Sequence, residues 1–312
     1  MTRAGKPKAL RVILSALVAD VVVAVTKFIA AGLSGSAAMF AEALHSLADS
    51  VNQVLLLVGH SRASRPPDEA HPFGYGKERF FWPFVVSVVI FSIGAVFSFI
   101  RGFQQVVSPH PLERFDLNYA ILAGAFVLDG AAWVIAWQEL HRAGQRGRSV
   151  FKLLKESKMV SVVTVFLEDA AAVIGVLIAA AGIAWAQFTK SWMLDGAASI
   201  LIGFLLLMIS WFIAVETKSL LIGESASKEH IGKIKQAIAC IPEVEGVLDL
   251  LTMHLGPEQI LVNLDLQFRD GLTTDEIETA IDHIERRIHE AVPEVYKIFV
   301  EAESVKKAIH RS

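Results

Sequence analysis

Residues 34–53 read SGSAAMFAEALHSLADSVNQ, and this stretch combines the apolar character of a membrane helix with a regular set of polar side chains. The polar residues recur at steps of three, four, three and one, namely Glu42, His45, Asp49, Asn52 and Gln53. Because residues three and four apart are neighbours on an α-helix, these side chains form one stripe. The opposite face is apolar. The pattern therefore predicts a membrane helix that turns one face toward a polar interior.

The composition indicates a membrane protein. The chain has 312 residues, of which 54% are hydrophobic, and this is too apolar for an ordinary soluble domain. A single cysteine, Cys240, excludes a disulfide framework and a cysteine-based zinc site, and its residue type predicts a buried position. The basic N-terminus runs into the first apolar segment without a cleavage pattern, so we expect a retained tail rather than a signal peptide.

Six apolar segments are each long enough to cross a bilayer, which requires about 20 residues. They cover residues 12–31, 37–59, 80–107, 117–137, 159–185 and 192–215. Basic residues gather in the N-terminal tail and in the loops after the second and fourth segments, whereas the alternate loops carry few. By the positive-inside rule, both termini are predicted to be cytoplasmic.

The last third of the chain has the character of a small soluble domain. Its hydrophobic pattern predicts a helix at 228–239, strands at 247–255 and 259–268, a second helix from Thr273 or Thr274, and a final strand at 295–300. The order αββαβ suits an α+β domain of ferredoxin-like type. We therefore expect a six-helix transmembrane domain at 1–215 and a cytoplasmic domain at 216–312. A domain this small is marginal alone, which makes pairing with a second copy plausible.

Several ionisable residues fall inside the predicted spans, where each costs about 2.5 to 3.5 kcal/mol to insert and is therefore expected to be functional. They are Asp20, Glu42, His45, Asp49, Asp129, Glu168, Asp169 and Asp195. No lysine or arginine in the span interiors is expected to neutralise them, since Lys27 lies near the outer end of the first span. One histidine with several carboxylates is a donor set for a divalent cation.

Two helices are predicted to supply the ligands. His45 and Asp49, four residues apart, share a helix face, and Glu168 and Asp169 would come from the fifth span. Adjacent residues point about 100° apart on a helix, so one of these two acids is expected to bind directly and the other to support it. For the remaining acids (Asp20, Glu42, Asp129 and Asp195), hydrogen bonds between helices or helix caps explain the pattern at least as well.

Two further motifs complete a family pattern: RPPDEAHPFGYGKER at 65–79 and WMLDGAASILIG at 192–203. With the stretch at 34–53, they make the chain resemble the cation diffusion facilitator family of divalent-metal transporters, and most of all the subgroup that includes the animal mitochondrial zinc transporter. The resemblance implies a transport site at His45, Asp49 and Asp169. The family usually has a further ligand four residues before that aspartate, where this chain has Val165, so Glu168 is the candidate replacement.

The resemblance also implies accessory residues and partners. Beside these, the helix pattern leads us to expect Glu42, Asp20 and Asn52 to be supporting neighbours of the site. In the loop after the second span, some members bind metal through an acid and two histidines; Asp68 and His71 fit that pattern, but Tyr75 stands at the second histidine position. The implied protein is a homodimer in a lipid bilayer, with no cofactor, no nucleic-acid partner and no enzymatic activity. We expect a bacterial inner membrane, because the chain is compact and shows no transit peptide.

The implied activity is the export of a divalent cation in exchange for protons. Zn²⁺ is the expected substrate, with Mn²⁺, Co²⁺, Fe²⁺, Ni²⁺ and Cd²⁺ as alternatives, because one histidine with three acids is a permissive donor set. Two rival interpretations remain. The departure at Val165 would suit a transport-inactive or regulatory member of the same fold. The Glu-x-x-His step of Glu42 and His45 would suit a di-iron carboxylate enzyme, which needs a second such step that the chain does not contain.

Overall fold

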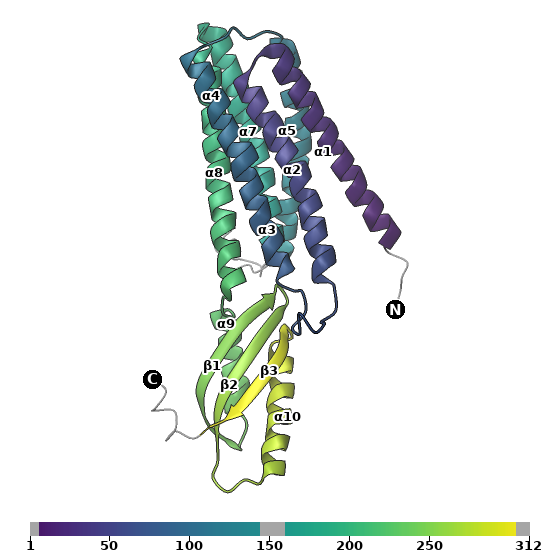
Figure 1. Ribbon diagram of the computed structural model, residues 1–312, viewed down its shortest axis with the longest axis vertical. Helices are drawn as coiled ribbons and strands as arrows, with labels where there is room; N and C mark the ends of the chain where they lie inside the picture. Colours follow the sequence, from purple (N-terminus) through teal and green to yellow (C-terminus); the bar gives the residue numbers. More distant parts are fainter. Residues whose placement is uncertain (1–5, 144–159, 304–312) are drawn as a thin grey trace. The chain divides into compact units, whose positions relative to one another are not determined.

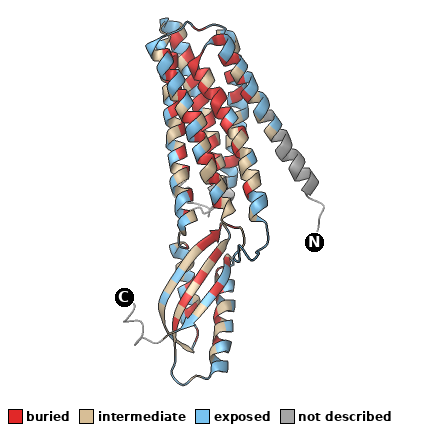
Figure 2. Cartoon of the chain, in the orientation of Figure 1, coloured by how far each residue is buried: buried red, intermediate tan, exposed pale blue. Residues whose placement is uncertain are grey.

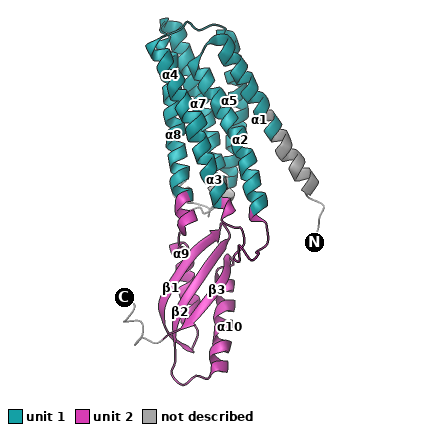
Figure 3. Ribbon diagram, in the orientation of Figure 1, with its two compact units in different colours: residues 1–62, 80–217 teal, residues 63–79, 218–312 magenta. Residues whose placement is uncertain are grey.

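The computed structural model describes residues 6–143 and 160–303. Residues 1–5 of the N-terminal tail and the loop at 144–159, which both carry basic residues that contribute to the predicted orientation, lie outside these ranges, as does the end of the chain from residue 304. The chain divides into two compact units, residues 1–62 with 80–217 and residues 63–79 with 218–312 (Figure 3). Each unit is described by itself.

The first unit is a bundle of long helices (Figure 1). Within the described residues, each predicted apolar segment lies in a helix, apart from Trp192 at the start of the sixth, and a helix satisfies its backbone hydrogen bonds internally. The helices are α1 (Lys6–Ser34), α2 (Ala37–Ala63), α3 (Glu78–Val89), α4 (Phe97–Val107), α5 (Phe115–Ala143), α7 (Val160–Thr189) and α8 (Met193–Ile222). A π-helical segment, η1 (Ile90–Val96), joins α3 to α4, so that the three form one continuous helix. The hydrophobic pattern did not predict this local widening.

Four helices in the described ranges are long and apolar enough to cross a membrane: Glu78–Val107, Phe115–Glu139, Val162–Thr189 and Met193–Ile222. The helical α1 and α2 are not among them, so a total of six spans stays a prediction. For α2, the reason is the polar stripe itself, which lowers the hydropathy of a 27-residue helix.

The polar stripe of α2 faces the inside of the bundle, as the sequence predicts. Glu42, His45 and Asn52 are buried, while Leu47 and Val54 on the other side are exposed (Figure 2). This is the reverse of a soluble amphipathic helix and suits a helix with lipid on its apolar side. The packing of α2 therefore directs its ionisable groups toward the neighbouring helices.

The start of α2 is held by a residue from another helix. Asp195, in the first turn of α8, accepts hydrogen bonds from the Ser36 hydroxyl (2.5 Å) and the Ala37 amide (2.6 Å). The backbone amides of the first turn of a helix, such as that of Ala37, have no partner within the helix. A carboxylate satisfies such an amide and also complements the helix dipole. Asp195 is thus a helix cap, one of the two roles that the sequence left open for it.

The second unit has the predicted order αββαβ (Figure 1). It comprises α9 (Lys228–Ala239), β1 (Val244–Gly256), β2 (Gln259–Phe268), α10 (Thr274–Ala291) and β3 (Val295–Ala302). β2 is the central strand and pairs antiparallel with β1 and parallel with β3. Alternate residues of β2 (Ile260, Val262, Leu264 and Leu266) form one hydrophobic core with isoleucines of α9 and α10. Cys240, at the end of α9, is exposed rather than buried.

The loop between α2 and α3 belongs to the second unit. The Lys77 ammonium donates to the Leu221 carbonyl (3.3 Å), and Phe73 meets Phe299 of β3 edge to face, with ring centroids 6.3 Å apart. Gly76 lies so close to Leu255 and Gln259 that a Cβ atom there would clash with both. These contacts fasten a loop from the first quarter of the chain to the C-terminal sheet.

Candidate metal site

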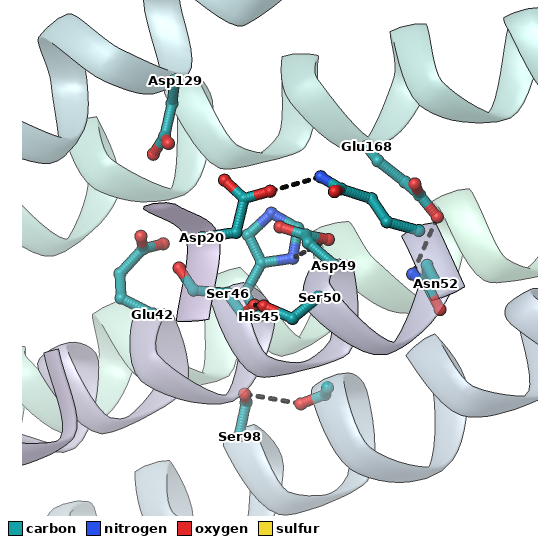
Figure 4. A network of polar contacts seen from close by, with 12 residues as sticks. Asp20, Glu42, His45, Ser46, Asp49, Ser50, Asn52, Ser98, Asp129 and Glu168 are labelled. Atoms are coloured by element: carbon teal, nitrogen blue, oxygen red, sulfur yellow. Dashed lines mark hydrogen bonds and ion pairs between the residues drawn. The ribbon is translucent and has the colours of Figure 1, made fainter. Parts of the chain in front are cut away.

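Polar side chains from four helices gather inside the first unit (Figure 4). Along α2 they extend from Glu42 to Gln53, eleven positions further on, which corresponds to about 16 Å of helix. The contributing residues are Asp20 and Lys27 of α1, Glu42, His45, Asp49, Asn52 and Gln53 of α2, Asp129 of α5, and Glu168 and Asp169 of α7. We call this set the polar column.

His45 and Asp49 form the centre of the polar column. The His45 Nδ1 atom lies 3.6 Å from the Asp49 Oδ1 atom, and the His45 side chain is 2% exposed. Neither ring nitrogen of His45 has a hydrogen-bond partner among the described residues, and neither has Asp49 Oδ1. Buried polar atoms are costly when unpaired, so such atoms are expected to bind something. An imidazole nitrogen and a carboxylate oxygen at this spacing are suitable metal ligands.

The acids of α7 lie next to this pair. Glu168 is buried and accepts a hydrogen bond from the Asn52 amide (2.9 Å), which ties α7 to α2. The charges of Glu168 and Asp169 both act on Asp49. The structure therefore brings the predicted residues of both helices into one neighbourhood and assigns Asn52 a supporting contact.

Asp20 is engaged by a different neighbour. Its carboxylate accepts a hydrogen bond from the Gln53 side chain, which links α1 to α2. Gln53 directly follows Asn52, so two adjacent side-chain amides of α2 donate hydrogen bonds to carboxylates of two other helices, α1 and α7. The C-terminal end of the polar stripe thus connects α2 to α1 through Gln53 and to α7 through Asn52.

The expectation about Lys27 is wrong. Its side chain is fully buried, and its ammonium lies 3.0 Å from Glu42 Oε2 and 3.7 Å from Asp129 Oδ2. The long, flexible side chain explains the difference, because it carries the charge several ångströms away from the backbone position near the outer end of α1. One feature of the sequence could have indicated this ion pair: Lys27 lies within an apolar run, the same one that contains Asp20. Pairing with Lys27 also removes support for Glu42 as an iron ligand.

The predicted ligands do not form a complete coordination shell. Among residues 6–143 and 160–303, no group of three or more His, Cys, Asp or Glu side chains is arranged to hold a metal ion. Val165, at the position where the family usually has a ligand, packs with Phe166 and Trp133 in an apolar cluster. The ligand set of His45, Asp49, Glu168 and Asp169 therefore remains a prediction, supported by proximity and by unpaired polar atoms.

The loop residues Asp68 and His71 are occupied with each other and with Tyr75. Asp68 accepts hydrogen bonds from the Tyr75 hydroxyl (2.6 Å) and from the His71 amide (2.7 Å). The Tyr75 bond is the main reason that the pKa of Asp68 lies below its usual value, and the same bond raises the pKa of Tyr75. Tyr75, which departs from the family pattern, thus donates a hydrogen bond to the Asp68 carboxylate where the pattern would place a second histidine.

Comparisons with known proteins identify both units. Residues 13–222 match the cation efflux transmembrane domain, and residues 226–305 match the cation efflux protein cytoplasmic domain. The mouse and human proton-coupled zinc antiporter SLC30A9, mitochondrial, are each 34% identical over 249 residues, which is 80% of this chain and 44% of each relative. This chain thus spans less than half the length of these mammalian relatives.

Other relatives differ in metal and in source. The manganese efflux system protein MneS of Bacillus subtilis is 26% identical over 277 residues, 89% of each chain. A solved structure of the MamM C-terminal domain in a nickel form matches 25% of this chain and 98% of its own, with 18% identity and a TM-score of 0.24. The match to the transmembrane domain alone covers more than half of the chain. The chain is therefore an integral membrane protein that belongs to the cation efflux family, the cation diffusion facilitators that its sequence resembles.

Proposed function

We propose that this chain transports a divalent metal ion, zinc in the first place, in exchange for protons. The observation that carries the proposal is the buried His45, with unpaired ring nitrogens, next to the partly buried Asp49 and beside Glu168 and Asp169 of α7. The mammalian relatives are named proton-coupled zinc antiporters, which supports both the metal and the coupling.

Zinc suits the donor set because imidazole nitrogen is a favourable zinc ligand and carboxylates complete a four-coordinate site. Manganese is the second candidate. Manganese is supported by the excess of carboxylates over histidine in the polar column, because oxygen donors suit Mn²⁺. The Bacillus relative is also named as a manganese efflux protein. The two metals differ in their need for His45, which makes that residue the point at which to separate them.

Proton exchange follows from the chemistry of the ligands. A carboxylate or imidazole must be deprotonated to bind a metal ion, so binding releases protons and protonation releases the metal. Asn52 and Gln53 would hold the acids of α7 and α1 in position through both steps. Alternating access then requires that α2 and α7 open in turn toward each side of the membrane.

The proposal includes an assembly and a location. We propose six spans, cytoplasmic termini and a homodimer through the second unit. Leu251 and Phe299 both pair with Asn263 in the sheet, on the face opposite the helices, and both are exposed, which offers an apolar surface to a second copy. A bacterial inner membrane stays a prediction, and the mammalian relatives are named as mitochondrial.

Transport by purified protein in proteoliposomes tests the proposal. With a zinc gradient across the membrane, the wild type should move zinc inward or outward with opposite movement of protons, and Asp49→Ala should abolish both. Zinc flux without proton movement would remove the antiport. Absence of flux for zinc, manganese and cobalt, with Asp49→Ala binding metal as well as the wild type, would favour the inactive or regulatory alternative.

A further inference from the structure

Lys27 has a position that the proposed transport mechanism does not use. Its ammonium is buried among three helices, paired with Glu42 of α2 and Asp129 of α5. In the described chain it is the one lysine or arginine among the buried residues. Burial of a charge is costly even when it is paired, and replacement of such a group by an apolar residue often stabilises a protein. A role in function would explain why the bundle contains it.

The pairing divides the acids of the polar column into two groups. Figure 4 shows Glu42 and Asp129 toward one end and Glu168 with Asn52 toward the other, with His45 and Asp49 between them. The column contains six carboxylates: Asp20, Glu42, Asp49, Asp129, Glu168 and Asp169. Lys27 binds two of them, Gln53 holds a third, and the other three are the predicted metal ligands.

Glu42 would be a metal ligand in a different environment. It precedes His45 by three residues, so both lie on the same face of α2. Its second oxygen, Oε1, has no hydrogen-bond partner within the described residues and lies against Gly175 of α7. A Cβ atom at residue 175 would collide with it, so α7 leaves room for this carboxylate. Its other oxygen, Oε2, is taken up by the ion pair with Lys27.

The number of available carboxylates decides which metal is favoured. Oxygen-rich sites suit Mn²⁺ and Mg²⁺, whereas a site with imidazole nitrogen suits Zn²⁺. Two more carboxylates beside His45 would shift the set toward oxygen. They would also add negative charge that a second cation could neutralise.

We propose that Lys27 is a specificity-determining residue that acts as a resident cation, keeping Glu42 and Asp129 away from divalent metal ions. The metal then meets one imidazole and the carboxylates of Asp49 and α7, a set with fewer oxygen donors than one that also contained Glu42 and Asp129, so the preference for zinc over manganese is greater than it would be without Lys27. This inference rests on the proposed function, because it concerns the same site.

Metal binding by the purified full chain in detergent tests the inference. Zn²⁺ and Mn²⁺ affinities are measured by calorimetric competition for the wild type, Lys27→Gln, Lys27→Arg and the double variant Lys27→Gln/Glu42→Gln. Lys27→Gln should raise the affinity for Mn²⁺ relative to Zn²⁺ at least tenfold. Lys27→Arg keeps the charge and should stay within threefold of the wild-type ratio. The double variant should recover most of the wild-type preference, because the released carboxylate is gone.

Folding and the failure of the parent proposal are controlled separately. A folded Lys27→Gln protein with the wild-type metal ratio would overturn the inference. If Lys27→Gln does not fold, Asp129→Asn decides: it should bind zinc as the wild type does, and a tenfold loss would show that Asp129 is a ligand despite Lys27. The proposed function fails in a different arm, through Asp49→Ala binding zinc with unchanged affinity, whatever the Lys27 variants do.

Discussion

Asp195 at the start of α8 binds Ser36 at the start of α2, with 2.5 Å between the Asp195 Oδ1 and Ser36 Oγ atoms. The two residues are 159 positions apart, and both are fully buried. Because the same carboxylate also accepts from the Ala37 amide, the first turn of the helix that carries His45 and Asp49 is attached to the last helix of the bundle. The position of the proposed metal site along the bundle therefore depends on this cap.

Asp195→Ala should destabilise the protein and weaken metal binding. Loss of a helix cap costs about 0.5 to 2 kcal/mol, and unpaired buried donors add a further cost of about 1 to 3 kcal/mol. Thermal unfolding in detergent, followed by zinc titration of the folded fraction, measures both effects. Asp195→Asn keeps one oxygen acceptor and should fall between the variant and the wild type. Unchanged stability of Asp195→Ala would show that the cap has no energetic role.

Asn52→Ala should weaken metal binding, and it should also cost about 1 to 3 kcal/mol of stability because the buried Glu168 carboxylate loses its donor. Asn52 holds Glu168 by a 2.9 Å hydrogen bond, and loss of a residue that orients a metal ligand typically costs about 10- to 100-fold in affinity. Zinc titration of the purified chain measures the change. The control is Ser50→Ala, since the Ser50 hydroxyl, also buried on α2, donates only to the Ser46 carbonyl of its own helix. Equal losses in both variants would contradict a specific role for Asn52.

Glu168→Ala and Asp169→Ala should separate the two acids of α7. We expect transport to be lost in Asp169→Ala, because this residue matches the family position, and to be reduced about tenfold in Glu168→Ala if that residue supports the site. Zinc flux into proteoliposomes is the measurement. Full loss in Glu168→Ala with flux retained in Asp169→Ala would reverse the assignment. Such a result would mean that Glu168, which Asn52 orients, replaces the ligand missing at Val165.

Tyr75→His should create a metal site in the loop at residues 63–79. The pKa of Asp68 lies below its usual value chiefly because of the Tyr75 hydrogen bond. Tyr75→His removes this bond, but an ordinary aspartate is also ionised at neutral pH, so the carboxylate stays available to a metal ion. With His71 three residues after Asp68 and a second histidine in place of Tyr75, we expect one additional zinc per chain by elemental analysis at pH 7. Tyr75→Phe removes the hydroxyl without adding a ligand and should bind no additional zinc. A gain in Tyr75→Phe would show that the hydroxyl alone had blocked the site.

Local patterns in the sequence predicted much of the fold. The helix at 228–239 and the strand at 259–268 agree with α9 and β2, because alternation and helical periodicity are visible in neighbouring residues. The second helix begins as expected, with Thr273 and Glu276 forming a capping box. The π-helical segment η1 and the parallel pairing of β3 with β2 were not predicted, since neither leaves a local signature.

The sequence by itself determined that α2 carries a polar stripe and that His45 and Asp49 share one face, because helical geometry relates residues three and four apart. The tertiary structure alone decided how that stripe is satisfied. Asn52 meets Glu168, and Lys27 reaches Glu42, across 116 and 15 residues of sequence respectively. Such pairings depend on how helices pack and how far a flexible side chain extends, and spacing along the chain records neither. The contact of the loop with the C-terminal sheet, between Phe73 and Phe299, was unpredictable for the same reason.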